Sequence, residues 1–276
     1  MIRRAGQAKL KDVAEASGVS ISTVSRVFSN PEMLAPQTVR RVKEVASRLR
    51  FSPNPLARAL ITGKSTNIGL VVLDISNPYM NTLLKAAQAR SRVRETGVFV
   101  ADTDGSAAIE REVCEQLAKQ CRGLILCAPR MSVPHIRAIN DIIPLVLVNS
   151  VVEGIPCIYT DSAPAMKELV DQLVELGHQK IAYLPGPLRS WANKQRARAV
   201  AEQSAARGVE LVKLEPTRAT HADGIKASTA AFECGATAVM AFDDVLSSGL
   251  VEGFRRLGLS VPGDMSVTGH DDVLAE

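Results

Sequence analysis

The sequence predicts an all-α helix-turn-helix head followed by an α/β body of doubly wound parallel sheets. Near the amino terminus, apolar residues recur at helical spacing on both sides of a glycine. From Thr66 onward, short continuous apolar runs alternate with longer helical segments, as in buried parallel strands joined by helices. The charge is also divided: residues 1–64 hold 12 Lys and Arg against 4 Asp and Glu, and the remainder hold 21 against 25.

Three short helices make up the predicted head. LKDVAEAS forms the first, and Gly18 suits the left-handed position just after its end. Ser20 is a good N-cap for a second helix over residues 21–28, and Pro36 fits the first turn of a third helix over residues 36–50. The expected apolar stripes are Leu10, Val13 and Ala14, then Val24, Val27 and Phe28, then Val39, Val42, Val45, Ala46 and Leu49.

The second helix has an unusual composition, because VSISTVSRVFSN is rich in β-branched and small polar residues that disfavour a free-standing helix. Its outward face carries small hydroxyls and Arg26. Hydroxyls can donate to phosphates or base edges, and arginine can pair bidentately with guanine. Ile21 and Ser22, at the helix start, would lie deepest in a major groove. The alternative is a generic three-helix bundle with a polar face, which the basic charge and the glycine-turn spacing disfavour.

The segment FSPNPLARALITGKST follows the head and contains two prolines and an asparagine, which indicate a linker. LARALIT has a helical pattern but is too short to be stable alone in water. Two interpretations remain open from the residues. The segment is either a plain flexible linker, which the physics favours, or a helix that forms only on DNA, with Leu60 wedged between base steps in the minor groove.

The body alternates strands and helices in a βαβ pattern. The predicted strands are NIGLVVL, VFVADT, GLILCAP, PLVLVNS, KIAYLP, VELVKL, AVMAFD and MSVTGH, and the predicted helices cover residues 79–95, 107–120, 133–141, 163–176, 193–207, 222–234 and 245–257. Ligands of such sheets bind beyond the carboxyl ends of the strands. Carboxylates and amides follow these strand ends, with Tyr79, Trp191 and Phe242 as flat faces, which suits a polyol or a sugar.

Several classes of protein are disfavoured. No apolar run is long enough to span a membrane, and the basic start leads into no signal-peptide core, so we expect a cytoplasmic protein without a membrane partner. The five cysteines are scattered and are expected to be reduced core thiols. There is no GxGxxG, GxxxxGKS/T or GxSxG motif, and the four histidines lack metal-ligand spacing. We therefore expect that the protein is not an enzyme and that it has no cofactor and no metal site.

Three stretches, LKDVAEASGVSISTVSRVFSNPE, SPNPLARAL and NIGLVVLDISNPY, strongly resemble the LacI/GalR family of bacterial transcription repressors. The resemblance runs from about Leu10 to the last residue. It implies a helix-turn-helix head (1–52), a hinge helix or linker (53–65), and two periplasmic-binding-protein-like lobes (66–160 and 161–276). It also implies a homodimeric repressor that reads a pseudo-palindromic operator in double-stranded DNA. A sugar, polyol or sugar acid bound between the lobes would control the operator affinity.

The resemblance also implies roles for single residues. Ile21, Ser22 and Arg26 would read bases. The expected backbone contacts are Ser20, Thr23, Ser25 and Asn30, and the expected hinge residues are Asn54, Ala57, which would pack against its dimer mate, and the minor-groove Leu60. Strand ends and resemblance together give the expected effector-binding residues, which are Ser76, Tyr79, Asn149, Trp191, Arg196, Phe242 and Asp271.

The sequence departs from the family pattern in four places. Lys9 replaces a capping Ser or Thr, Arg50 replaces a glycine, and Phe242 replaces an Asn or Ser, which would alter how hydroxyls are read. Relatives also continue beyond HDDVLAE, so we expect the sheets to lack their last strands. Two other classes of protein fit the sequence less well. A periplasmic-type solute-binding protein would have a signal peptide and no DNA-reading head, and an α/β sugar-metabolising enzyme would need a catalytic constellation.

Overall fold

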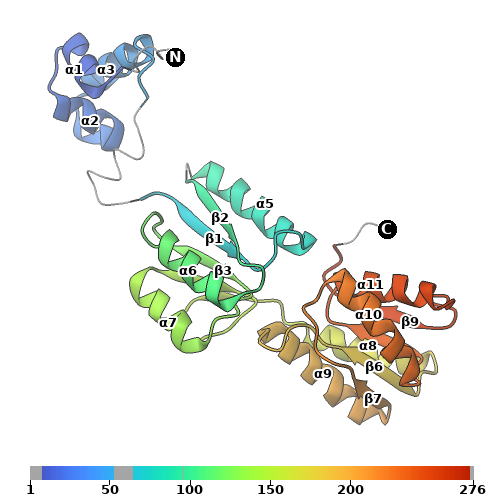
Figure 1. The fold of residues 1–276 in the computed structure, drawn as a ribbon. Coiled ribbons are helices and arrows are strands. Elements are labelled where there is room, and N and C mark those ends of the chain that lie inside the picture. Colours follow the sequence, from blue (N-terminus) through green and yellow to red (C-terminus); the bar gives the residue numbers. More distant parts are fainter. Residues whose placement is uncertain (1–7, 53–64, 95, 274–276) are drawn as a thin grey trace. The chain divides into compact units, whose positions relative to one another are not determined.

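The computed structural model describes residues 8–52, 65–94 and 96–273 (Figure 1). Asn54, Ala57 and Leu60 of the predicted hinge lie outside the described residues. Contacts divide the chain into two compact units, a head up to Ser65 and a body from Thr66.

The head contains the three predicted helices, α1 (Leu10–Ser17), α2 (Ile21–Ser29) and α3 (Pro36–Arg48). A short 3-10 helix, η1 (Pro31–Met33), was not predicted and links α2 to α3. The apolar stripes of the three helices meet in one core, whose fully buried members are Val13, Ala14, Val24, Val27, Val42, Val45 and Ala46. Since the buried members of that core are all valine or alanine, the helices can pack closely, and α2 is supported by its neighbours.

The ends of the head helices are fixed by local hydrogen bonds. Gly18 has φ 66°, the left-handed conformation expected after α1. The Ser20 side chain caps α2 by accepting from the Thr23 backbone N–H at 3.1 Å. At the start of α1, where Lys9 offers no hydroxyl, the Asp12 carboxylate accepts from the Lys9 backbone N–H at 2.7 Å. Asp12 therefore supplies at the third helical position the restraint that a capping box uses.

Arg50 ends α3 in a left-handed conformation, with φ 52°. The Phe51 N–H donates to the Ala46 carbonyl at 2.8 Å, and the Arg50 N–H donates to the Ser47 carbonyl at 3.0 Å. This pair of bonds is the Schellman pattern. The Phe51 ring meets the Phe28 ring at a centroid distance of 5.7 Å, which joins the end of α3 to α2.

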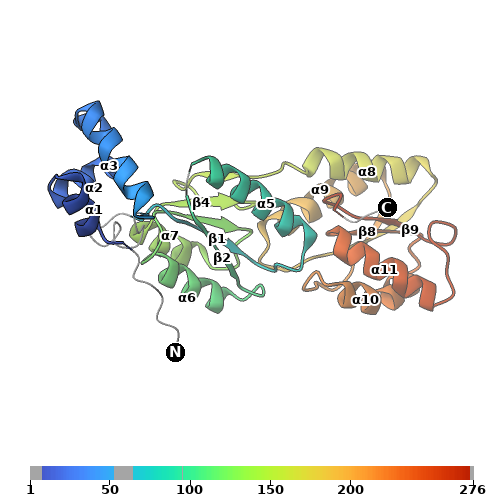
Figure 2. The ribbon, with the colours of Figure 1, turned by 90° about the horizontal axis from the view of Figure 1, so that it is seen from above.

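The first sheet of the body has five parallel strands in the order β2-β1-β3-β4-β5. The strands are β1 (Ile68–Val72), β2 (Val98–Asp102), β3 (Leu124–Cys127), β4 (Leu145–Val148) and β5 (Cys157–Ile158). Helix α5 (Pro78–Val93) covers one face, where Leu70 and Val72 pack with Met80. Helices α6 (Ala107–Leu117) and α7 (Val133–Ile142) cover the other face (Figures 1 and 2).

The second sheet has four parallel strands in the order β7-β6-β8-β9. The strands are β6 (Lys180–Leu184), β7 (Glu210–Lys213), β8 (Ala238–Ala241) and β9 (Ser266–Thr268). Helices α8 (Ala163–Glu175) and α9 (Trp191–Arg207) pack on one face around Ile181 and Tyr183. Helices α10 (His221–Glu233) and α11 (Asp244–Arg256) pack on the other, around Ala182 and Leu184. Adjacent residues of β6 thus face opposite helix layers, as expected for a strand buried on both faces.

Both sheets have the same winding. The chain leaves β1 to form β2 on one side and then β3 on the other, and it repeats this order from β6 to β7 and β8. The strand order therefore reverses between β1 and β3 and between β6 and β8, where doubly wound sheets bind ligands. In the part of the chain that the structure describes, no helix is long and apolar enough to cross a membrane.

Glycines set the distance between α10 and α11. A Cβ added to Gly249 would overlap the His221 carbonyl oxygen and the Gly224 Cα. We expect Gly249→Ala to lower the free energy of unfolding of the body by about 1–3 kcal/mol, the usual cost of overpacking a core. Urea denaturation followed by circular dichroism measures this. Val251→Ala, at an exposed position of the same helix, is the control, and equal effects of the two substitutions would contradict the close approach.

The left-handed Arg50 gives a second stability prediction. An L-residue in this conformation is strained, so Arg50→Gly should stabilise the head by about 1 kcal/mol. Hydrogen exchange of α3 amides in the intact chain should slow by about fivefold, which corresponds to that free energy. Arg50→Ala removes the same charge but keeps the Cβ, so it should give no such gain. Slower exchange in both variants would show that charge, rather than backbone strain, is responsible.

Candidate functional site

The outward face of α2 is the first candidate site. Val24 and Val27 form its buried side and Phe28 packs beside them, so Ile21, Ser22, Ser25 and Arg26 make up the outward face. Ile21, a large apolar residue, is 50% exposed at the first position. Ser22, Ser25 and Arg26 are also exposed. An apolar side chain kept in water at the start of a helix, beside hydroxyls and one guanidinium, suits contact with another surface.

The hydroxyls at the start of α2 form a local network. The Ser20 Oγ lies 2.8 Å from the Ser22 Oγ and 2.8 Å from the Thr23 Oγ1. Asn30 follows the end of the helix and is exposed. The structure thus places all seven predicted head residues, from Ser20 to Asn30, on α2 or at its ends.

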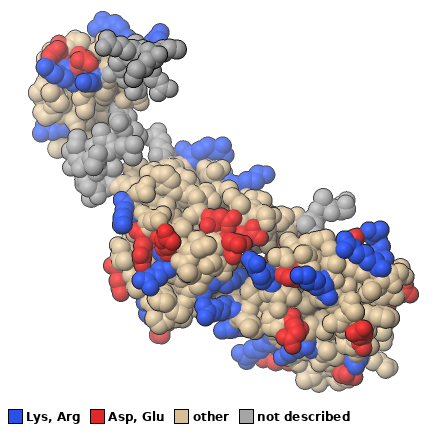
Figure 3. All heavy atoms as spheres, viewed as in Figure 1, with Lys and Arg blue, Asp and Glu red and all other residues tan. Residues whose placement is uncertain are grey.

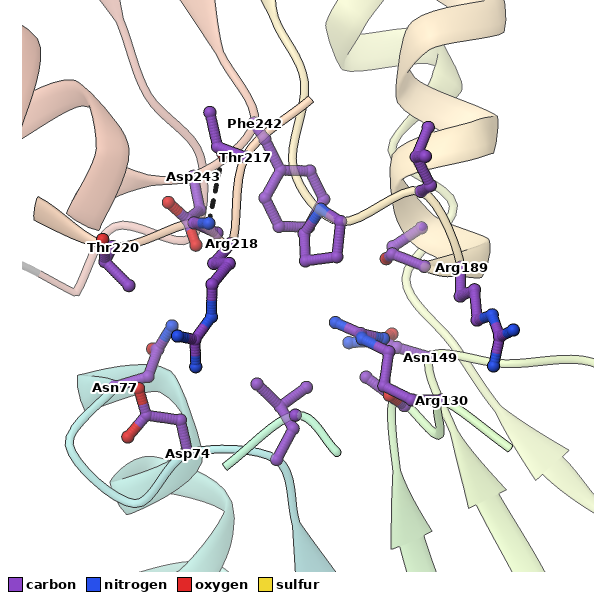
Figure 4. Close-up of a pocket in the computed structure, with 18 of the residues that line it drawn as sticks. Asp74, Asn77, Arg130, Asn149, Arg189, Thr217, Arg218, Thr220, Phe242 and Asp243 are labelled. Carbon is purple, nitrogen blue, oxygen red and sulfur yellow. Dashed lines mark hydrogen bonds between the residues drawn. The ribbon is translucent and has the colours of Figure 1, made fainter. Parts of the chain in front are cut away.

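The second candidate site is a cavity of about 520 Å³ in the body, at the carboxyl ends of the strands of both sheets (Figure 4). Five of the predicted effector-binding residues line it, namely Tyr79, Asn149, Arg196, Phe242 and Asp271. The other two do not. The Ser76 hydroxyl donates to the Asp74 carboxylate at 2.6 Å, and the Trp191 ring packs edge-on against Tyr159 with a centroid distance of 5.0 Å.

Asn149 connects the lining of the cavity to the chain that leaves the first sheet. Its side-chain amide donates to the Tyr79 hydroxyl at 2.8 Å, and its carbonyl oxygen accepts from the Thr160 N–H at 3.2 Å. Burial raises the pKa of Tyr79, so the phenol stays protonated and keeps a proton to donate. The pair presents two fixed polar groups of the kind that orient a hydroxylated ligand.

Arg196 is the most tightly held cation of the cavity, with only 5% of its surface exposed. It donates to the Phe242 carbonyl oxygen at 2.5 Å and to the Asp271 carboxylate at 3.5 Å. Its guanidinium carbon lies 4.7 Å from the centre of the Phe242 ring, within cation–π range. The Phe242 ring, which was expected to stack on a ligand, therefore also supports Arg196. The ring lies so close to Gly186 that a Cβ at that position would overlap it.

Burial shifts the acid–base behaviour of this region. It raises the pKa of Asp243 to about 7 and, despite the nearby Arg196, that of Asp271 to about 6. Burial and the charge of Arg196 lower the pKa of His270 to about 4, so this imidazole is neutral at pH 7. Asp243 also caps α11 by accepting from the Leu246 N–H at 2.9 Å.

The sequence interpretation missed three cavity-lining arginines, Arg130, Arg189 and Arg218. All three lie in loops after strands, but the sequence prediction chose mainly carboxylates and amides at the strand ends and did not include these arginines. Counting every charged residue within a few positions of each predicted strand end would have found them. Among the described residues, no group of His, Cys, Asp or Glu is arranged to hold a metal ion.

The backbone around the cavity is also unusual. Five of its lining residues have positive φ although none is glycine, namely Asp104, Ala128, Asn149, Ala219 and Asp271. Strained conformations of this kind tend to gather at ligand sites. Together with the paired hydroxyl, amide, carboxylate and guanidinium groups, they describe a site built to bind a polar molecule.

Comparison with family models identifies both units. Residues 65–274 match the periplasmic binding proteins and sugar binding domain of the LacI family. Residues 9–54 match the bacterial regulatory proteins of the lacI family.

Curated relatives and solved structures agree. The chain is 29% identical to the transcriptional regulator GalS of Salmonella typhimurium, over 96% of this chain and 80% of that protein. It is 31% identical to the regulator DegA of Bacillus subtilis, over 96% and 82%. The Lac repressor dimer, solved with operator and the anti-inducer ONPF, has the same fold, with a TM-score of 0.84 at 24% identity over 97% of this chain and 83% of that one.

The raised pKa of Asp243 predicts a pH dependence of stability. The folded pKa of about 7 lies above the unfolded value of about 3.9, so the stability from this group is lost progressively as pH rises from about 3.9 to about 7. Asp243→Asn keeps a capping oxygen but cannot ionise. We therefore expect its free energy of unfolding to fall less between about pH 5 and pH 7 than that of the parent chain.

Urea denaturation at the two pH values measures the difference. His270 contributes equally to both proteins and does not disturb the comparison. Asp141→Asn, at an exposed position of α7, should leave the pH dependence of the parent unchanged. Parallel profiles for Asp243→Asn and the parent would show that Asp243 is ionised at both pH values.

Proposed function

This chain belongs to the LacI family of bacterial regulatory proteins, and we propose that within it the protein is a transcriptional repressor controlled by a small metabolite. Members of this family are transcription regulators rather than enzymes. The observation that carries the proposal is the exposed face of α2, on a basic head joined to a body with a ligand cavity.

The head supplies the DNA contacts in this proposal. A recognition helix docks with its first residues against base edges, and Ile21 and Ser22 stand at that end of α2. Arg26 lies one turn further along and can pair with a guanine. The residues that flank this face and would bind phosphates are Ser20, Thr23, Ser25 and Asn30.

On the face drawn in Figure 3, cationic and anionic side chains are intermixed over the body, and this face of the body has no broad area of either sign.

The proposed protein acts as a homodimer on a pseudo-palindromic operator. A single small head makes too few contacts for specific affinity, and two-fold symmetry of a dimer matches two half-sites in opposite orientation. The Lac repressor similar to this chain was solved as an operator-bound dimer. We assign residues 1–52 to the head, 53–65 to the hinge, with Asn54, Ala57 and Leu60 as its DNA-contacting or dimer-contacting residues, and 66–160 and 161–276 to the two lobes. The proposal places the protein in the cytoplasm, with the DNA.

A sugar, polyol or sugar acid is the proposed effector class. The cavity offers fixed donors and acceptors from both sheets, as recognition of several hydroxyls requires. Related structures carry carbohydrates, including a CelR complex with cellobiose and an Enterococcus faecium regulator with ribose. A ligand that contacts both sheets favours one of their relative positions. By linkage, effector and operator must then change each other's affinity by the same factor.

Arg26 provides the test of DNA reading. Selection of genomic fragments by the purified dimer should yield one palindromic family of sites, and Arg26→Ala should cost about 1–3 kcal/mol of discrimination at one base pair per half-site. Gel shifts on operator variants measure this. Arg40→Ala, on an exposed position of α3, should leave the preference among variants unchanged. A parent protein that binds every duplex equally well would overturn the proposal.

A further inference from the structure

The charged residues of the cavity are unevenly paired. Five aspartates and four arginines line it, namely Asp74, Asp104, Asp223, Asp243 and Asp271, and Arg130, Arg189, Arg196 and Arg218. Two arginines have carboxylate partners, since Arg196 pairs with Asp271 at 3.5 Å and Arg218 with Asp104 at 3.4 Å. Within the described residues, neither Arg130 nor Arg189 forms an ion pair.

The other three lining aspartates, Asp74, Asp223 and Asp243, accept hydrogen bonds from groups of the protein. Asp243 and Asp223 cap α11 and α10, and Asp223 also accepts from the Arg218 N–H at 3.1 Å. Asp74 accepts from the Ser76 N–H and hydroxyl. None of these three carboxylates forms an ion pair with Arg130 or Arg189, so among the described residues these two are the lining cations without a carboxylate partner.

Of Arg130 and Arg189, Arg130 is the stronger evidence for an anion site, because only 6% of its surface is exposed. Its guanidinium donates to the Ala128 carbonyl oxygen at 2.7 Å. The nearby Glu110 carboxylate is occupied by backbone N–H groups, those of Arg130 at 2.7 Å and Met131 at 3.1 Å. Burial lowers the pKa of Arg130, and the charge of Glu110 opposes this only in part. A cation held away from water in this way is costly unless a partner supplies the opposite charge.

The surroundings of Arg130 favour an anion. Figure 4 shows Arg130 beside Asn149, with Arg189 on the same side of the cavity and Asp74 and Asn77 on the opposite side. Arg189 directly precedes Ser190, the N-cap of the 17-residue helix α9, and Ser190 also lines the cavity. Helix N-termini attract negative charge. The cavity is therefore polarised, with a cationic side formed by both sheets and an acidic side that can accept from hydroxyls.

We propose that the effector is a polyhydroxylated anion, a sugar carrying a carboxylate or a phosphate, whose charged group pairs with Arg130 and whose hydroxyls face the aspartates. Arg189 and the start of α9 complete the anion site from the second sheet. This inference rests on the proposed function and narrows its effector class from sugars in general to charged ones. A guanidinium binds both carboxylate and phosphate bidentately, so the two groups share one recognition chemistry.

Calorimetric titration of the full chain tests the inference with matched ligands. Each set holds a neutral sugar, its uronic acid and its 6-phosphate, in gluco and in galacto configuration. At least one anion should bind about tenfold more tightly than its neutral parent, as expected for an added charge-assisted contact. Its affinity should fall as salt is added, since salt screens the charges. The acid and phosphate arms show which anionic group fits. A neutral sugar that binds as tightly as both of its anions would overturn the inference.

Substitutions at Arg130 locate the anion site. Arg130→Gln keeps hydrogen-bond donors but removes the charge, so it should weaken the preferred anion about tenfold and bring it to the level of the neutral sugar. Arg130→Lys keeps the charge and should retain most of the preference, which separates loss of charge from loss of folding. Arg137→Gln, at an exposed position of α7 outside the cavity lining, is the control. Full anion preference in Arg130→Gln would overturn the assignment.

Operator binding in the same preparations separates the two proposals. If a neutral sugar alone changes operator affinity, the anion inference is wrong and the repressor function stands. If the parent chain prefers no genomic site over random duplex, the repressor function is wrong, whatever the calorimetry shows.

Discussion

Because every strand in the body runs parallel to its neighbours, all the loops that follow the strands of a sheet leave it at the same edge, and this constraint creates the site. The polar side chains after β1, β4, β6, β8 and β9 are far apart in sequence but line a single cavity. The cores of the sheets are almost wholly apolar and hold the strand ends in register. The loops can therefore carry left-handed residues and buried charges, because the sheets beneath them supply the stability.

Buried charge is the second organising feature of the body. The Arg196 guanidinium contacts a carbonyl oxygen, an aromatic ring and Asp271, which belong to two different strand ends, while its Nε has no hydrogen-bond partner among the described residues. That set fixes the positions of β8 and β9 relative to α9. Phe242, which stands where the family pattern has an Asn or Ser, thereby supports Arg196 through its ring and its carbonyl oxygen.

Much of the fold was predictable from the sequence because its signals are local. The stripe of Val24, Val27 and Phe28, the left-handed Gly18 and the Ser20 cap depend on neighbouring residues, and all are present in the structure. The alternation of apolar runs with helical segments likewise gave the parallel sheets. The 3-10 helix η1 was missed because three residues carry too little periodicity for a pattern to be recognised.

The cavity was predicted less completely. The rule for strand ends placed Tyr79, Asn149 and Asp271 correctly at its lining, whereas Ser76 turns to Asp74 instead. Which charges stay unpaired, as for Arg130, depends on contacts between loops that no local pattern records.

The edge contact between Tyr159 and Trp191 has a practical consequence. Tyr159 lies just past β5 of the first sheet, Trp191 begins α9 of the second, and the chain has one tryptophan. The indole therefore sits where the polypeptide crosses from one sheet to the other. A rotation of the sheets about that crossing would change the surroundings of the one tryptophan, so tryptophan fluorescence of the native chain would report such a rotation without an attached dye.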